Sequence, residues 1–187
     1  MVKVTRKRYY NMHTIGESIL RCIGWLVLAG LLVHVAGLVP DCLAGKSDMQ
    51  LVHLYFSDAK RPFLIAEERV VINPGNPIAF GRQLVLELIH GSARGHLPTV
   101  PEGTNLRSFF LLEDGTAVAD FSAQLRENHP GSCRREQLTL FSVVNSLILN
   151  VPEIDRVKIL IDGAETPTLT GHLPLAFPLT ADMLLTR

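Results

Sequence analysis

The feature that most constrains this chain is an uncharged hydrophobic run from Ile23 to Val39. The run contains no Asp, Glu, Lys or Arg, and as a helix it would be about 25 Å long, enough to cross a thin bilayer core. A buried helix of a globular domain usually keeps a polar face towards water, and this run has none. The sequence therefore predicts a transmembrane helix over residues 23–39.

The charges before the run predict its orientation. Five basic residues and one acidic residue precede it, and basic residues favour the cytoplasmic side of a membrane. Residues 1–22 are therefore predicted to be a basic cytoplasmic N-terminus, with the rest of the chain on the periplasmic or cell-wall side.

Two fates of the hydrophobic run remain open from the sequence. Pro40 would end the helix, and Cys42-Leu43-Ala44 loosely resembles a signal-peptidase site, so a cleaved signal peptide would give a secreted protein. The long polar N-terminus favours an uncleaved signal-anchor instead. Pro40 and Asp41 directly before Cys42 argue against lipid attachment to that cysteine.

The remainder of the 187 residues is long enough for one domain. Polar and small residues over 40–48 indicate a linker, so the domain is expected to occupy residues 49–187. With five of 18 basic and one of 18 acidic residues upstream, 13 basic and 17 acidic residues remain. The sequence shows no clustered basic face, and a nucleic-acid partner is therefore not predicted.

Two amphipathic helices are predicted within this domain. The first begins at an Asn76 cap followed by Pro77 and ends before Gly91, and its apolar residues recur every three or four positions. The second begins at a Ser132 cap and reaches about Leu149, with an apolar face broad enough to indicate a central packing position.

The strands are predicted from β-branched and alternating patterns bounded by turn residues. Residues 106–112 and 116–121 form a hairpin around Glu113-Asp114-Gly115, in which Ala117, Ala119 and Phe121 share one face. The other predicted strands are 51–56, a second strand or bent pair over 63–66 and 69–72, 156–161, and a weak extended piece over 168–173.

This order of elements predicts an α+β fold. Strand, strand, helix, hairpin, helix and strand would be satisfied by one mixed or antiparallel sheet with both helices on one face.

An ordered set of short motifs resembles the GerMN domain family of sporulation and spore-germination proteins. The motifs lie at residues 54–57, 88–91, 100–104, 113–122, 143–147 and 157–163. The resemblance covers about 51–173 and implies a βαββαβ-type domain similar to the ring-building motifs of secretion systems. Ser146 stands where the family usually has Thr, and residues 180–187 fall outside the pattern.

The resemblance implies no catalytic residues, and the motif residues have structural interpretations. Glycines would occupy turns, Asp120 and Ser122 would bind backbone where a strand ends, and Asn145 would hydrogen-bond from a helix into the adjoining loop. The motif residues treated in this way are Pro101, Gly103, Asp120, Phe121, Ser122, Asn145, Asp162 and Gly163.

The other residues that could act as metal ligands or catalytic groups match no known arrangement well. His90 and His96 match no usual metal-ligand spacing. Glu102 with Asp120 could form a glycosidase pair only at a separation that the sequence does not define. Cys133 at a helix start could be a nucleophile but has no assignable partner, and whether it pairs with Cys42 is open. The sequence predicts no enzyme, metal or cofactor, and His129 and His172 are expected to be solvated in loops.

The function predicted from these observations is a non-enzymatic, membrane-tethered domain of the cell envelope that mediates binding or assembly, of the sporulation, germination or cell-wall type. Expected partners are envelope proteins or peptidoglycan-associated machinery, with homo-oligomers also open. The alternative is an extracytoplasmic protein that binds peptidoglycan or a small ligand in a pocket beneath residues 91–104.

Overall fold

The computed structural model describes residues 48–187. The predictions for residues 1–47, which include the basic N-terminus, the transmembrane run, its cleavage, Cys42 and all of the linker except Asp48, lie outside the described residues. None of the helices found in residues 48–187 combines the length and hydrophobicity needed to span a bilayer.

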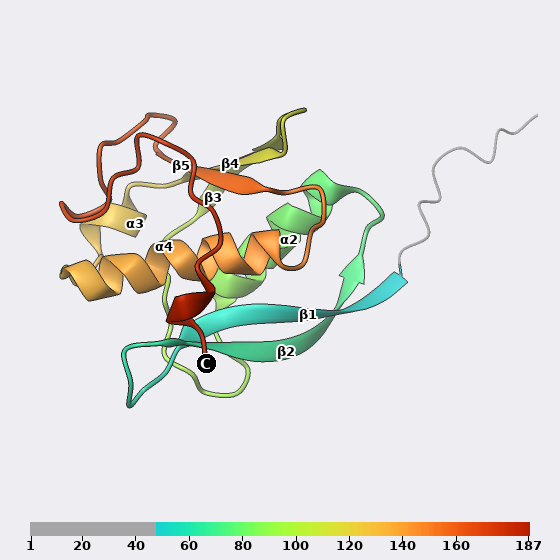
Figure 1. The fold of residues 1–187 in the computed structure, drawn as a ribbon, viewed down its shortest axis with the longest axis horizontal. Coiled ribbons are helices and arrows are strands. Elements are labelled where there is room, and N and C mark those ends of the chain that lie inside the picture. Colours follow the sequence, from blue (N-terminus) through green and yellow to red (C-terminus); the bar gives the residue numbers. More distant parts are fainter. Residues whose placement is uncertain (1–47) are drawn as a thin grey trace, which may run out of the picture. The chain divides into compact units, whose positions relative to one another are not determined.

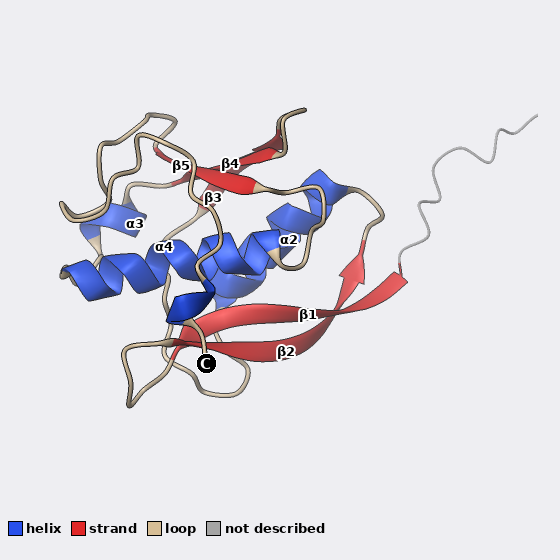
Figure 2. Cartoon of the chain, viewed as in Figure 1, coloured by secondary structure: helices blue, strands red, loops and turns tan. Residues whose placement is uncertain are grey.

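The domain is α+β, with two sheets and its helices between them (Figures 1 and 2). The first sheet is an antiparallel hairpin of β1 (Asp48–Ser57) and β2 (Leu64–Asn73), and the second has the order β3-β4-β5. The bounds of the remaining elements are α2 Pro77–His90, β3 Leu106–Leu111, β4 Thr116–Phe121, α3 Gln124–Glu127, α4 Cys133–Ile148, β5 Arg156–Ile161 and the 3₁₀ turn η1 Met183–Leu185.

The prediction of one sheet with both helices on a single face is wrong. Helix α4 packs on β1 as well as on β5, and α2 packs on β1 as well as on β3. Most residues of α4 from Leu138 to Leu147 are buried, so this helix needs covering on both sides. Its predicted central position is confirmed, and that position is what separates the strands into two sheets.

The β1–β2 hairpin is regular along its whole length. Cα partners run without a bulge from Asp48 opposite Asn73 to Ser57 opposite Leu64, so the second strand is continuous rather than a bent pair. Asp48, predicted as the end of the linker, is already part of β1. Val52, Leu54 and Phe56 point into the core because alternate residues of a strand face opposite sides.

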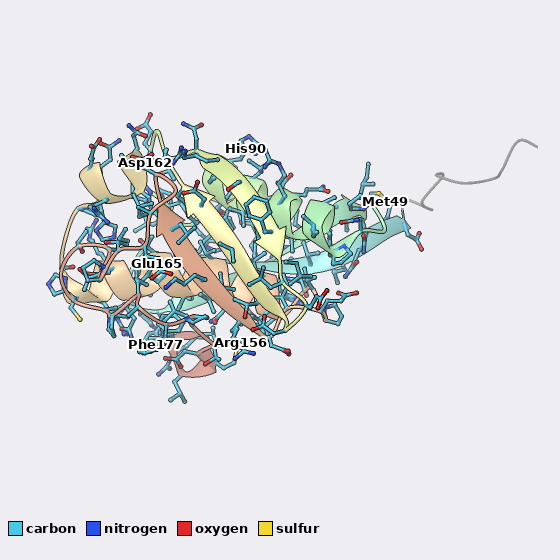
Figure 3. All side chains as sticks on the ribbon, turned by 90° about the horizontal axis from the view of Figure 1, so that it is seen from above. Met49, His90, Arg156, Asp162, Glu165 and Phe177 are labelled. Atoms are coloured by element: carbon cyan, nitrogen blue, oxygen red, sulfur yellow. The ribbon has the colours of Figure 1, made fainter. Side chains whose placement is uncertain are left out.

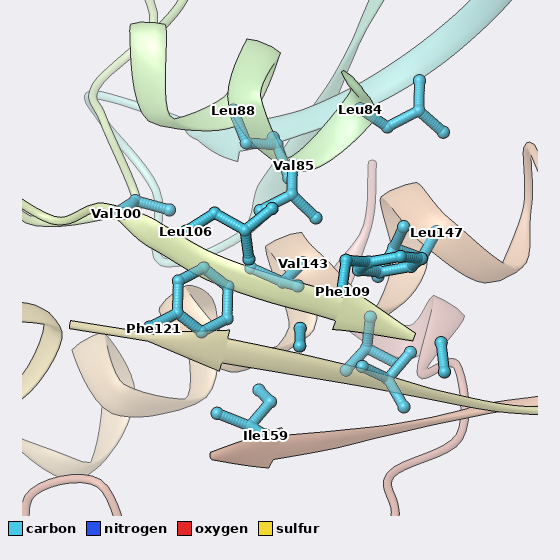
Figure 4. Packing of buried hydrophobic residues seen from close by; sticks show 14 of the residues in the cluster. Leu84, Val85, Leu88, Val100, Leu106, Phe109, Phe121, Val143, Leu147 and Ile159 are labelled. Atoms are coloured by element: carbon cyan, nitrogen blue, oxygen red, sulfur yellow. The ribbon is translucent and has the colours of Figure 1, made fainter. Parts of the chain in front are cut away.

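Strand β4 lies at the centre of the second sheet. It pairs antiparallel with β3 and parallel with β5. Ala117, Ala119 and Phe121 are fully buried on its inner face, as the alternation predicted. Figure 4 shows Phe121 and Phe109 packed with side chains of α2 and α4 in the main core.

Both predicted helix starts are confirmed. The Asn76 side chain accepts hydrogen bonds from the N–H groups of Ile78 and Ala79, and Gly91, with φ of 92°, caps the end of α2 directly after His90. The Ser132 side chain accepts a hydrogen bond from Arg135 N at the start of α4. These contacts satisfy amide groups that have no partner within the helix.

The C-terminal segment differs from its prediction. Residues 168–173 form no strand but a series of turns, with one isolated bridge between Thr168 and Pro174. Leu179 pairs with Val157 at the edge of β5, and Leu185 is buried against the first sheet. The segment therefore closes both sheets, although residues 180–187 lie outside the family pattern.

Candidate functional site: a basic groove at the start of α4

Three segments far apart in the sequence meet at one end of the domain and enclose an open groove. They are the β1–β2 connection, the segment before β3 and the first turns of α4; Figure 1 shows the β1–β2 connection and the start of α4 at the same end of the molecule. The groove has a volume of about 700 Å³, which is within the usual range for small-ligand sites. It is lined by residues 57–62, 97–102, 130, 132, 134, 135, 138 and 139.

The rim of the groove carries an excess of positive charge. Lys60, Arg61, Arg134 and Arg135 line it, against only Asp58 and Glu102. The residues that follow the hydrophobic run are acidic as a whole, so this concentration of basic side chains is local. The sequence did not predict a clustered basic face because these four residues come from two segments about seventy positions apart.

Two of the groove's charged residues are already engaged by neighbours. The Asp58 carboxylate accepts hydrogen bonds from Lys60 N at 2.6 Å and Arg61 N at 3.1 Å, which hold its pKa below the ordinary value. The Arg134 guanidinium lies 5.4 Å from the centroid of the Phe63 ring and donates a hydrogen bond to Gln137 at 2.8 Å. Within residues 48–187, no hydrogen bond or ion pair involves the charged groups of Lys60, Arg61 or Arg135.

Thr99 and Thr139, which line the groove, belong to a hydrogen-bonded row of side chains. Thr139 donates to Thr99 O at 2.6 Å, and the hydroxyls of Thr99 and Ser142 are 2.6 Å apart. His129 Nε2 lies 3.1 Å from the Thr139 hydroxyl, and burial lowers the pKa of His129. The expectation that His129 is simply solvated is therefore wrong.

The pocket predicted beneath residues 91–104 has a different location. Val100 is only 4% exposed and packs into the main core, so the space under this part of the loop is filled. The groove lies instead between the loop and the start of α4.

A buried carboxylate on α4 holds the C-terminal turns next to the groove. Glu136 is fully buried and accepts hydrogen bonds from Leu169 N, Thr170 Oγ1, Leu173 N and both the backbone and ring of His172. Burial alone would raise its pKa, but these donors outweigh burial and lower the pKa to about 2. His172 is an exposed loop residue, as expected, but its ring and its backbone N–H also bond the buried Glu136 carboxylate.

Glu67 on β2 has the same role at the loop after α2. Its carboxylate is 1% exposed and accepts from Arg69, from the Ser92 hydroxyl at 2.5 Å and from Ala93 N at 3.1 Å. These contacts lower its pKa to about 2 against the opposing effect of burial. Neither glutamate was a candidate from the sequence, because a lone Glu in a strand or helix gives no local sign of its distant partners.

The motif residues at the ends of β4 and β5 contact one another. Asp120 accepts a hydrogen bond from Gly163 N at 2.8 Å, and Arg107 lies 3.5 Å from Asp120 and 3.3 Å from Asp162. Asp162 and Gly163 have φ of 53° and 77°, which suits the tight turn that follows β5. Ser122 accepts from Asn105 N at 3.0 Å, and Phe121 lies in the core.

The remaining motif residues fix a turn and the C-terminal tail. Pro101 O accepts from Thr104 N at 3.3 Å in a turn that places Gly103 at φ of 81°. Asn145 donates to Asp182 O at 2.9 Å and accepts from Asp182 N at 3.0 Å. Its partner is the C-terminal tail, 37 residues away, rather than the adjoining loop that the sequence suggested.

The structure does not gather the candidate catalytic residues. Glu102 is on the groove rim, whereas Asp120 is at the end of β4 and is not part of the groove lining. Cys133 is the exposed first residue of α4, and His129, the nearest histidine in sequence, bonds to Thr139 and Gly131.

The candidate metal ligands His90 and His96 are not part of a metal-binding group in the described residues. His90 ends α2, and His96 follows in the next loop. Among the described residues, no three His, Cys, Asp or Glu side chains are grouped to hold a metal ion.

The fold and the groove define an α+β domain with the element order β1-β2-α2-β3-β4-α3-α4-β5 and a surface site formed by two loops and the start of α4. A family model described as Germane, sporulation and spore germination, matches residues 53–167. Because that match covers more than half of the chain, the protein belongs to the Germane family, the family of the GerMN domains that the sequence motifs resemble.

Solved structures agree with this assignment. A protein from Clostridium perfringens, provisionally described as a lipoprotein, is 27% identical with a TM-score of 0.51, over 71% of this chain and 87% of that one. The first GerMN domain of the sporulation protein GerM from Bacillus subtilis is 24% identical with a TM-score of 0.54, over 70% and 97%.

The tandem GerMN domains of the same Bacillus subtilis protein give a TM-score of 0.58 at 24% identity. That match covers 71% of this chain but only 46% of the tandem chain. At this identity the two GerM comparisons establish the fold. No curated protein matches the sequence significantly.

Proposed function

We propose that this chain is a non-enzymatic, membrane-tethered domain of the cell envelope that mediates binding or assembly. Its basic groove would bind another envelope protein. The single observation that supports binding at this place is the open groove of about 700 Å³ with three unengaged basic side chains on its rim. Unpaired basic groups around a concave surface favour an acidic partner, because charge complementarity raises both the rate and the specificity of association.

Membership in the Germane family supports the envelope setting. The family description names sporulation and spore germination, and the similar Clostridium perfringens protein is described provisionally as a lipoprotein. The family is not known for enzymatic activity. The hydrophobic run Ile23–Val39 supports a membrane tether for this chain.

Site-specific crosslinking in intact cells tests the groove as the binding surface. A photoreactive residue at Ala59 or Arg135, both on the rim, should form adducts with one defined partner. The same residue at Glu153, exposed and outside the groove lining, is the matched control. Equal adducts at Glu153 and Arg135 would remove the groove from the proposal.

The second candidate, a binder of peptidoglycan or of another anionic ligand of the envelope, is favoured by the same excess of charge. Lys60→Glu with Arg135→Glu should lower co-sedimentation with isolated peptidoglycan at least tenfold, and added salt should lower it for the parent chain. Arg82→Glu, an exposed charge reversal on α2, should leave sedimentation unchanged. Sedimentation that ignores both salt and the groove variant would reject this ligand.

The non-enzymatic part of the proposal has its own test. The purified chain incubated with peptidoglycan should release no soluble fragments. Release that is lost on Glu102→Gln or Asp120→Asn would show a hydrolase and overturn the proposal.

A further inference from the structure

The outer end of the β1–β2 hairpin has a patch of exposed aliphatic side chains. Met49 lies opposite Ile72, and Leu51 lies opposite Val70, in the antiparallel register. Directly opposite residues share a face with their Cβ atoms about 5 Å apart, so the four side chains are contiguous. They are 64%, 54%, 54% and 55% exposed in the order Met49, Leu51, Ile72 and Val70. We call these four residues the hairpin patch.

No other part of the described domain covers the hairpin patch. Further along the same face, Tyr55 and Leu64 are buried with Leu138 and Leu185, so that part of the sheet is covered. His53 and Glu68, 3.8 Å apart and half exposed, separate the covered part from the patch. Figure 3 shows Met49 at the end of β1 that projects from the domain, away from Asp162 and Phe177.

The position of the patch in the sequence indicates what covers it. Eight residues, 40–47, separate Val39 at the end of the hydrophobic run from Asp48 at the start of β1. A chain of that length spans at most about 29 Å. If residues 23–39 cross the bilayer, the patch is the first part of the domain beyond it and cannot move far from the lipid surface.

The charge around the patch fits a lipid interface. On its own face the patch is bordered by His53 and Glu68, whereas Gln50 and Asn73, hydrogen-bonded at 2.6 Å, lie on the opposite face of the hairpin. No Lys or Arg lies on this face of the hairpin, so the patch would bind a bilayer interface through its apolar area, which does not require anionic lipid. Four aliphatic side chains would bind weakly alone, but a short tether raises their effective concentration at the membrane to the millimolar range.

We propose that the hairpin patch of Met49, Leu51, Val70 and Ile72 docks onto the outer surface of the bilayer that holds the tether. This docking rests on the proposed membrane tether. It would fix the domain with β1 and β2 against lipid and direct the groove, at the opposite end of β1, away from the membrane surface.

The test uses the full chain in zwitterionic phosphatidylcholine vesicles that contain brominated lipid as a fluorescence quencher. Trp25 is the only tryptophan, so Trp25→Phe provides a silent background. Met49→Trp in that background should be quenched at least twofold by the brominated lipid. Phe177→Trp, at an 81% exposed site outside the patch, is the matched control and should not be quenched.

A second variant separates docking from mere proximity. Leu51→Asp with Val70→Asp should abolish quenching of Met49→Trp while the chain still floats with the vesicles. Both positions are exposed, so folding should persist, which circular dichroism checks. Quenching that survives these two aspartates would overturn the docking.

The other outcomes of the experiment distinguish lipid docking from contact with a second copy and from failure of the tether. A chain that floats but leaves Met49→Trp unquenched and open to aqueous acrylamide overturns the docking and leaves the tether intact. Protection from acrylamide without lipid quenching, rising with protein density in the vesicle, would assign the patch to a second copy of the chain and overturn the lipid proposal. A chain that fails to float with the vesicles would overturn the membrane tether. Absence of crosslinks at the groove would overturn only the groove as a binding surface and would leave the docking of the hairpin patch unaffected.

Discussion

At the scale of single residues, polar side chains of α4 and the turn after it substitute for a missing strand. Asn150 accepts from His53 N at 2.9 Å and donates to His53 O at 2.8 Å, and Ser146 accepts from Tyr55 N at 3.0 Å. These backbone groups lie on the edge of β1 away from β2, where no further strand pairs within residues 48–187. The side chains therefore seal an edge that would otherwise expose unpaired donors and acceptors.

Asn150→Asp tests this substitution for a strand. The new carboxylate keeps the shape but cannot donate to His53 O or to Ser146 O, the latter now 2.7 Å from the Asn150 amide. A buried carboxylate that faces two carbonyl oxygens without a hydrogen bond should lower the free energy of unfolding by about 2–4 kcal/mol. Urea unfolding of fragment 45–187 measures it. Asn105→Asp, at an exposed site, is the control, and equal losses in both variants would contradict the prediction.

Residue roles could be predicted only where the partner is local. The Asn76 and Ser132 caps follow from their own sequence neighbours, and the structure confirms them. Asn145 was assigned to a hydrogen bond near its helix, but its partner Asp182 is far along the chain. Glu136 was missed because its donors are backbone amides that reach it only after the fold closes.

At the scale of elements, the approach of α2 to β3 depends on a helical glycine. A Cβ atom at Gly81 would lie 2.6 Å from Cζ of Phe109, whose ring is buried in the main core. That distance is shorter than any van der Waals contact, and a packed core leaves the ring little room to move. Gly81 therefore sets how closely the helix and the sheet can pack.

Gly81→Ala should destabilise the domain by up to about 2 kcal/mol. The helix gains about 1 kcal/mol from the better helix former, but overpacking costs about 1–3 kcal/mol. In a Phe109→Leu background the clash is relieved, and the same alanine should be neutral or stabilising. Thermal unfolding of the four members of this double-mutant cycle measures the coupling. Additive effects of the two substitutions would show that the Phe109 ring does not limit how closely α2 packs on β3.

Elements were more predictable than their arrangement. Periodicity and turn residues located both long helices and the strands of both hairpins, because these signals are local. Alternation shows which face of a strand is buried but not which strands pair. The division into two sheets depends on α4 being buried on both sides, and the groove depends on two loops and the start of α4 meeting in space.

At the scale of the whole molecule, two buried carboxylates bind the long loops to the core. Glu67 holds residues 92–94 and Glu136 holds residues 169–173, each by several donated hydrogen bonds. The domain therefore depends on two negative charges, one on β2 and one on α4, to hold loop segments that have no regular structure of their own.

Acid should weaken the domain through these two groups. Both have a pKa of about 2 in the folded state, against the ordinary glutamate value of 4.5 in the unfolded chain. A depressed folded pKa gives stability that is complete above pH 4.5 and is lost as the pH falls towards 2. Each group would contribute about 3 kcal/mol by linkage.

Urea unfolding of fragment 45–187 at pH 7, 4.5 and 3 measures this loss. Glu136→Gln should be less stable at pH 7 and show a shallower decline, so that its difference from the parent chain narrows in acid. A parent chain whose stability is constant from pH 5 to pH 2.5 would contradict the assignment.

The sealed edge of β1 has a consequence for how the protein is made. Asn150 follows His53 by 97 residues, and ribosomes add about 5–20 residues per second. The hairpin therefore emerges with its edge open for about 5–20 s before the residues that close it exist. During that interval the nascent chain presents a template for strand pairing with other chains, so its safe maturation depends on how quickly synthesis delivers α4 or on a chaperone that shields the edge.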